Sequence, residues 1–136
     1  MVEIATHLVE NVIPCVPIRQ FVISFPKRIR HYLPKQKILQ DVLRIVVDEI
    51  RKRIIACSPD VPHPQIGAVS FIQHFGKTLN FHPHFHLVVA DGIFNIEGTE
   101  LRFHEACLTP DDIADTQDSI QKRVLIDDAK VVYLAV

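Results

Sequence analysis

Apolar residues recur at two different periods along this chain, and the period predicts which segments are helices and which are strands. Residues 35–56 carry apolar side chains at four-residue spacing, namely at Ile38, Val42, Val46, Ile50 and Ile54. An α-helix completes a turn in about 3.6 residues, so this spacing gathers the apolar side chains into one stripe. Because Pro34 precedes the segment and Ser58-Pro59 follows it, we expect one long core helix between them.

Runs of β-prone residues bounded by turn residues occupy the middle of the chain. We expect strands over residues 19–25, 65–75, 81–90, 93–96 and 100–104, with turns at 76–80 and 97–99. A second helix is expected from Thr109 to near Leu125, because Thr109 suits a helix N-cap and Pro110 the first helical position. The terminal segments predict a short helix over 3–13 and a strand-like stretch over 131–136.

This order of a strand, a long helix, several consecutive strands and a helix indicates an α+β fold. We expect an antiparallel sheet with helices packed on one face. The 136 residues suffice for a single domain, 1–136, that buries roughly two-thirds of the surface of its unfolded chain. The chain is 48% hydrophobic and 23% charged, which argues for a globular protein and against a disordered one.

The lack of a recognisable targeting segment and the usage of cysteine both predict a cytoplasmic protein. No apolar run approaches the roughly 20 residues that would span a bilayer, and the N-terminus lacks the basic start of a signal peptide. We therefore expect no membrane contact. The three cysteines, Cys15, Cys57 and Cys107, are odd in number and far apart, so we expect them to be reduced and structural.

The charge of the chain is unevenly distributed, although its net charge is only −1. Basic residues gather in the N-terminal half and aspartates in the C-terminal quarter, so one side of the molecule suits phosphates and the other repels them. The alternative is that both groups are solvated helix faces. The basic residues are Lys27, Arg28, Arg30, Lys35, Lys37, Arg51, Lys52 and Arg53, and the aspartates are Asp111, Asp112, Asp115, Asp118, Asp127 and Asp128.

The run His82-Pro83-His84-Phe85-His86 carries the most informative polar residues of the chain. Side chains of a strand alternate between its two faces, so three imidazoles at alternate positions share one face and can converge on a metal ion. Phe81, Phe85, Leu87 and Val89 point the other way, toward the helices. The alternative interpretation is a histidine cluster on an ordinary solvated surface.

Strand pairing suggests a further metal ligand. If the turn between the second and third strands is centred near Thr78 and Leu79, Gln73 lies opposite His84 and Phe71 lies opposite His86. Gln73 then becomes the third ligand. A slip of one residue would instead turn His74 toward the histidine face, so this assignment depends on the register.

Two neutral imidazoles and an amide oxygen suit a divalent cation that keeps further positions for water or phosphate oxygens. A closed zinc site would need a fourth ligand, for which His82 is the nearby candidate. Pro83 removes a ladder donor and can bulge the strand, which would turn His82 away from the other two histidines. His82 is therefore left open as a ligand.

The motif His84-Phe85-His86 resembles the His-hydrophobe-His signature of HUH endonucleases, which include replication initiators, relaxases and certain transposases. The resemblance extends to bacterial insertion-sequence transposases of the two-tyrosine, rolling-circle class and covers residues 5 to 125. The segments that carry it are Pro17-Ile18-Arg19-Gln20-Phe21-Val22-Ile23-Ser24-Phe25-Pro26 and Phe75-Gly76-Lys77-Thr78-Leu79-Asn80-Phe81-His82-Pro83-His84-Phe85-His86.

This resemblance implies a ferredoxin-like sheet of the Rep and relaxase type that holds Mg or Mn against the scissile phosphate of single-stranded DNA at transposon ends. A tyrosine then attacks the phosphate and leaves a 5′-phosphotyrosine and a free 3′-hydroxyl. In relatives the position of Gln73 can hold histidine, which favours Gln73 over His74 as a ligand. The residues expected to bind DNA are Arg19, Lys27, Arg28, Arg30 and Lys77.

The chain departs from these relatives at both ends, so we expect a central fragment of such a transposase. It carries no cysteine-rich zinc segment and no tyrosine pair within an arginine- and proline-rich motif. Its two tyrosines are Tyr32, expected to pack or contact the backbone, and Tyr133, the candidate nucleophile by its place in the chain. We therefore expect a catalytically incomplete DNA nickase.

Two alternatives stay open beside this hypothesis. One is a non-catalytic remnant that binds single-stranded DNA and regulates an intact transposase, and the other is a decayed reading frame. Val69, Phe71 and Val88 would share the histidine face and leave it apolar and uncovered in a decayed copy. The expected partners are single-stranded DNA and a second copy of the chain or an intact transposase, in a bacterial, nucleoid-associated setting.

Overall fold

The computed structural model describes residues 15–27, 30, 35–75, 81–124 and 133–135. Within them lie two helices and six strands. The expected helix over 3–13 and the turn at 76–80 fall outside the described residues. The elements are β1 (Ile18–Ser24), α2 (Gln36–Ala56), β2 (Ala68–Phe75), β3 (Phe81–Ala90), β4 (Gly92–Glu97), β5 (Glu100–Glu105), α3 (Pro110–Arg123) and β6 (Tyr133–Ala135).

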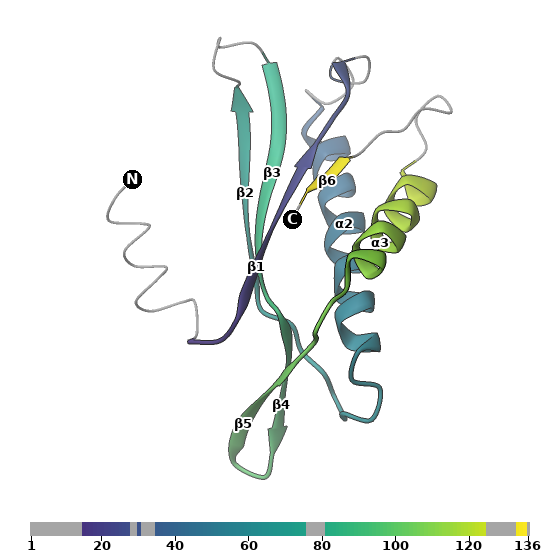
Figure 1. Cartoon of the computed structure of the whole chain (residues 1–136). Helices are drawn as coiled ribbons and strands as arrows, with labels where there is room; N and C mark the ends of the chain where they lie inside the picture. Colours follow the sequence, from purple (N-terminus) through teal and green to yellow (C-terminus); the bar gives the residue numbers. More distant parts are fainter. Residues whose placement is uncertain (1–14, 28–29, 31–34, 76–80, 125–132, 136) are drawn as a thin grey trace.

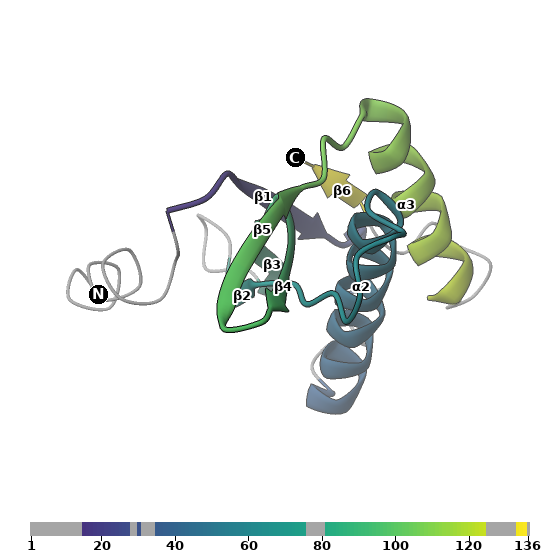
Figure 2. The ribbon, with the colours of Figure 1, turned by 90° about the horizontal axis from the view of Figure 1, so that it is seen from below.

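Four of these strands form one antiparallel sheet in the order β2-β3-β1-β6. Strands β1 and β2 are parallel to each other with β3 between them, and α2 connects them along the chain. Strands β3 and β6 are likewise parallel with β1 between them, and α3 lies between them along the chain. Both helices lie on the same side of the sheet (Figures 1 and 2). This confirms the predicted α+β fold, and the strand order agrees with the expected ferredoxin-like arrangement.

The β4–β5 hairpin differs from the prediction of a single sheet. Among the described residues its strands pair with each other and with no further strand, apart from an isolated bridge between Gln65 and Phe94. The hairpin extends from one end of the main sheet (Figure 1). It is inserted between β3 and α3, so it leaves the order of the four main strands unchanged.

The core lies between the helices and the inner face of the sheet. The four-residue stripe of α2 is buried from Val42 to Ile54, as predicted. Alternate residues of β3 meet it, because Phe85, Leu87 and Val89 are each at most 1% exposed. Phe85 also packs edge-on against Phe25, with ring centroids 5.7 Å apart.

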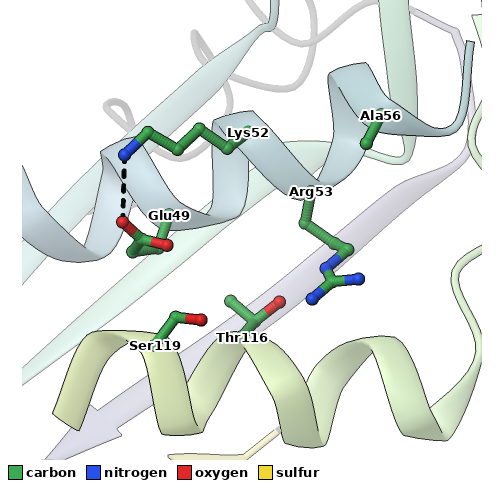
Figure 3. A pocket seen from close by; sticks show the side chains of 6 residues that line it. All are labelled: Glu49, Lys52, Arg53, Ala56, Thr116 and Ser119. Carbon is green, nitrogen blue, oxygen red and sulfur yellow. Dashed lines mark hydrogen bonds and ion pairs between the residues drawn. The ribbon is translucent and has the colours of Figure 1, made fainter. Parts of the chain in front are cut away.

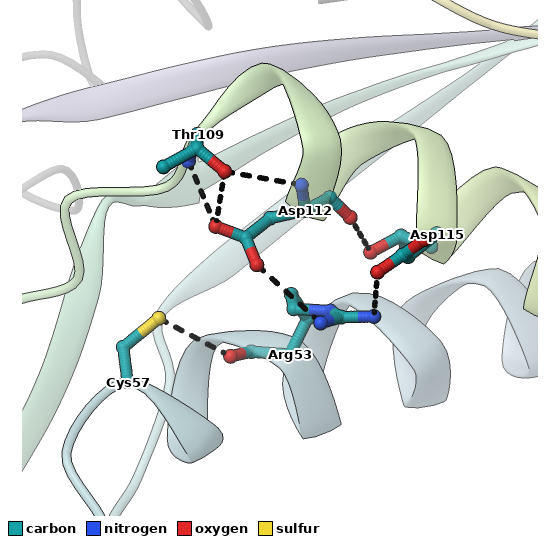
Figure 4. A network of polar contacts seen from close by, with 6 residues as sticks. Arg53, Cys57, Thr109, Asp112 and Asp115 are labelled. Carbon is teal, nitrogen blue, oxygen red and sulfur yellow. Dashed lines mark hydrogen bonds and ion pairs between the residues drawn. The ribbon is translucent and has the colours of Figure 1, made fainter.

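A capping box fixes the start of α3, as the sequence predicted for its N-terminus. The Asp112 backbone N–H donates to the Thr109 hydroxyl, and the Thr109 backbone N–H donates to the Asp112 carboxylate. The same carboxylate accepts from Arg53 of α2, which also pairs with Asp115 (Figure 4). This network therefore joins the beginning of α3 to the last turns of α2.

The three cysteines are free, as predicted, but all three are exposed, so none packs in the core. The Cys57 thiol donates to the carbonyl of Arg53 (Figure 4). Partial shielding from water, and then the neighbouring Asp112 carboxylate, raise the pKa of this thiol. The described part of the chain includes no helix with the length and apolar character needed to cross a membrane.

Candidate functional site

Strand β3 presents its histidines on the sheet face that the helices leave open. Phe85 is fully buried on the helix side, and His84 and His86 flank it on the other side. Their ring centroids are 5.0 Å apart. The alternation predicted from the sequence therefore brings two imidazoles side by side on an open surface.

The register of β2 against β3 is the one expected. Gln73 pairs with His84, and Phe71 pairs with His86. Because paired residues of antiparallel strands share a face, Gln73 and not His74 lies beside the histidines.

The hydrogen bonds of His84 define which of its nitrogens is available. Nδ1 lies 3.0 Å from the carbonyl oxygen of His82, to which it can only donate. A neutral imidazole carries one N–H, so Nε2 then holds a lone pair. Nε2 also lies 3.0 Å from Oε1 of Gln73, a second acceptor. A cation or a proton between them satisfies both atoms, and a half-turn of the Gln73 amide would instead let its NH2 group donate to Nε2.

The 3.0 Å separation of these two atoms is that of an ordinary hydrogen bond, and it also matches two adjacent ligands of an octahedral cation. Adjacent ligands about 2.1 Å from an octahedral ion are separated by about 3.0 Å. The His84 Nε2 and Gln73 Oε1 atoms have this separation. The amide oxygen suits Mg or Mn and the imidazole nitrogens suit transition metals, and the set lacks the thiolates or fourth firm ligand of a closed zinc site.

Gln20 of β1 is a member of this cluster that the sequence interpretation missed. Its Nε2 lies 3.0 Å from Nδ1 of His86. Gln20 and His86 are separated by 66 positions in the chain, and only the pairing of β1 with β3 brings them together. The alternation of β1 could have indicated this residue, because it places Gln20 on the histidine face, opposite Val88.

His82 lies next to this pair but does not complete a three-histidine site. The register shifts between Gln73 and Phe75, so the bulge expected at Pro83 is present. The bulge does not carry His82 away, since its ring centroid is 5.5 Å from that of His84. Burial, and then the nearby Arg30, lower the pKa of His82. Among the described residues, no three His, Cys, Asp or Glu side chains form a metal-binding group.

The residues expected to bind DNA do not all lie near the histidines. Arg19 points to the helix side and forms a two-point ion pair with Asp91, with N–O distances of 3.2 and 2.7 Å. The structure therefore does not bring Arg19 to the histidines. Arg30 donates to the Phe25 carbonyl just beyond β1, close enough to His82 to affect its pKa. Lys27 is exposed in the same loop, and Arg28 and Lys77 lie outside the described residues.

Tyr133, the candidate nucleophile, occupies a position in line with the metal-binding candidates. It pairs with Ser24, Ser24 pairs with His84, and His84 pairs with Gln73. These four residues form one row across the sheet. Two strand spacings separate the backbones of Tyr133 and His84, or about 10 Å. Tyr32 lies outside the described residues.

The predicted apolar residues of the open face are also present. Val69 pairs with Val88, two positions along from the pair of Phe71 and His86. Phe71 is 42% exposed. An exposed aromatic ring thus lies directly across from a histidine of the site.

A groove lies on the other side of the sheet, between α2 and α3, and is lined by Glu49, Lys52, Arg53, Ala56, Thr116 and Ser119 (Figure 3). Its cations already have partners, because Lys52 pairs with Asp48 and Glu49, and Arg53 with two aspartates of α3. Part of the basic run expected to favour phosphates is therefore neutralised by helix carboxylates. The open sheet face is the better candidate site.

Comparison with protein families relates the second half of this chain to transposases. Residues 67–130, just under half of the chain, match the family described as "Putative transposase". The match runs from the start of β2 through α3 and includes Gln73, His84 and His86. No curated protein and no solved structure matches the chain.

Proposed function

We propose that this chain is a transposase-like domain of the HUH type that binds single-stranded DNA through a divalent cation on its open sheet face. The observation that carries the proposal is the pairing of Gln73 with His84, whose facing oxygen and nitrogen lie 3.0 Å apart beside His86. The family match over residues 67–130 supports a role in DNA transposition.

The residues of the open face have complementary tasks in this proposal. His84, His86 and Gln73 hold Mg or Mn, which supplies positive charge to neutralise a phosphodiester. Arg30 adds a positive charge near the same end of β3. Phe71 offers an exposed ring to a DNA base, and stacking of this kind tolerates any sequence. The acidic helix α3 lies on the helix side of the sheet (Figure 2), so its carboxylates would face away from DNA bound at the histidines.

Strand cleavage is an extension of this proposal that the position of Tyr133 favours. The phenol oxygen of Tyr133 would attack the phosphorus and form a phosphotyrosine, while the bond from phosphorus to O3′ breaks. The departing O3′ takes up a proton and becomes a free 3′-hydroxyl, and the phenol loses its own. Without such an attack the same face supports a non-catalytic module that binds single-stranded DNA.

Binding of a labelled single-stranded oligonucleotide tests the proposal. We expect Mn²⁺ to strengthen binding, EDTA to reverse the effect, and the double variant His84→Ala, His86→Ala to lose at least about tenfold in affinity with Mn²⁺. His63→Asn, in the loop between α2 and β2, is the matched control, because His63 has a positive φ of 50° that asparagine tolerates. Equal binding by all three proteins in EDTA and in Mn²⁺ would refute the proposal.

The same mixture separates cleavage from binding alone. An SDS-resistant protein–DNA adduct that forms with the wild-type chain, and not with Tyr133→Phe, would establish Tyr133 as the nucleophile. Mn²⁺-dependent binding without any adduct would instead identify a non-catalytic DNA-binding module.

A further inference from the structure

Gln20 contacts His86 but is not one of the proposed metal ligands. Its amide lies 3.0 Å from Nδ1 of His86 across the β1–β3 pair. We propose that Gln20 is a positioning residue that orients His86 and, by a half-turn of its amide, accommodates the form of the ring that can bind a cation through Nε2. The inference rests on the proposed metal site and assigns a role to a residue outside its ligand set.

Each of the two site histidines is held through its Nδ1 atom. Nδ1 of His84 contacts the His82 carbonyl, and Nδ1 of His86 contacts Gln20. A histidine that binds a metal through one nitrogen needs a hydrogen-bond partner on the other, which fixes the orientation of the ring. Both histidines have such a partner on Nδ1: the carbonyl of His82 leaves the lone pair of His84 on Nε2, whereas the Gln20 amide has to turn before His86 can offer Nε2.

The amide of Gln20 can pair with either neutral form of His86. Its Nε2 faces Nδ1 in the structure, so the amide donates and the proton of His86 resides on Nε2. A half-turn of the amide places Oε1 there, where it accepts from an Nδ1–H. The lone pair of His86 then resides on Nε2, which becomes free to bind a cation.

Gln20 lies outside the packing that stabilises the sheet. Its neighbour Phe21 is 1% exposed and Ile23 is fully buried, whereas the contact of Gln20 with His86 is exposed. Substitution of Gln20 therefore changes the surroundings of His86 and leaves the core intact. This separation allows a positioning role to be tested apart from folding.

Three variants test the proposal in the full chain. Gln20→Leu removes both hydrogen-bonding functions at similar size, and Gln20→Glu can only accept from Nδ1–H. Ser24→Ala is the matched control, because Ser24 lies on the same strand and face opposite His84. Free Mn²⁺ is measured by its EPR signal during titration. Long-range ¹H–¹⁵N correlations of the His86 ring in metal-free protein report which nitrogen carries the proton.

We expect Gln20→Leu to weaken Mn²⁺ binding about tenfold or more, and Gln20→Glu and Ser24→Ala to keep at least wild-type affinity. The metal-free wild-type ring should carry its proton on Nε2, and the Gln20→Glu ring on Nδ1. Wild-type affinity in Gln20→Leu would overturn the positioning role and leave the metal site intact. Failure of the wild-type chain and Ser24→Ala to bind Mn²⁺ would overturn the metal site and the inference with it.

Discussion

Adjacent residues of β3 have opposite tasks, and this alternation is the central feature of the molecule at the residue scale. Phe85 is fully buried and packs edge-on against Phe25. His84 and His86 lie on the other face and contact Gln73 and Gln20. Folding and the proposed chemistry are thus assigned to different residues of one strand.

Substitutions on the two faces of β3 should therefore differ in their effect on stability. His84→Ala is expected to change the free energy of unfolding by no more than about 0.5 kcal/mol, because its ring is not part of the core. Phe85→Ala should cost about 3–5 kcal/mol through the cavity it leaves. Urea unfolding measures both values. A loss as large in His84→Ala as in Phe85→Ala would contradict this assignment.

Some site residues could be predicted from the sequence because they depend on local pattern. His84 and His86 follow from strand alternation, and Gln73 from the short connection to β2. Gln20 could not be predicted in this way, since its contact with His86 depends on which distant strand pairs with β3. Arg19 was expected to bind DNA. It lies on the helix side because it alternates with Gln20 along β1, and the buried Asp91 carboxylate pairs with it there.

At the scale of elements, α3 depends on its N-terminal cap. The exchange of hydrogen bonds between Thr109 and Asp112 satisfies backbone N–H groups that have no partner within the helix. Thr109→Ala is expected to lower the free energy of unfolding by about 1 kcal/mol. Thermal unfolding followed by circular dichroism measures this change, and Thr109→Ser should retain most of the stability. Equal stability of the alanine and wild-type chains would contradict the proposed cap.

The same cap predicts a dependence on pH. The backbone N–H and hydroxyl of Thr109 donate to the Asp112 carboxylate and hold its pKa below the ordinary value of 3.8. A carboxyl with a lowered pKa stabilises the fold above its unfolded pKa, and this contribution is lost as the pH falls through the folded pKa. Asp112→Ala should therefore lower the melting temperature at pH 7 more than at about pH 3. An equal difference at both values would contradict this linkage.

The bounds of α2 and β3 could be predicted closely because their periodicity is strong and proline or turn residues border them. The separation of the β4–β5 hairpin could not, since strand order depends on tertiary packing and not on local sequence. A strand near the C-terminus was predicted, and it is observed as β6. Because β6 pairs with β1, Tyr133 lies in the same row of paired residues as His84. The sequence pattern does not reveal this pairing.

The whole molecule is a sheet with two unlike faces. The helices cover one face and neutralise much of their own charge, with Arg123 paired to Asp48 and Glu49 of α2. The other face carries the histidines together with Phe71, which is 42% exposed. The exposed ring fits an account in which this face meets another molecule, for which single-stranded DNA is the proposed candidate.

The central claim of this account is that His84 and His86 hold a divalent cation on the open face. Titration of Mn²⁺ into the wild-type chain, with free Mn²⁺ followed by EPR, tests it most directly. The account predicts saturable binding that His84→Ala reduces by at least about tenfold and that the control His63→Asn leaves unchanged. Absence of binding by the wild-type chain, or equal binding by wild type and His84→Ala, would contradict it.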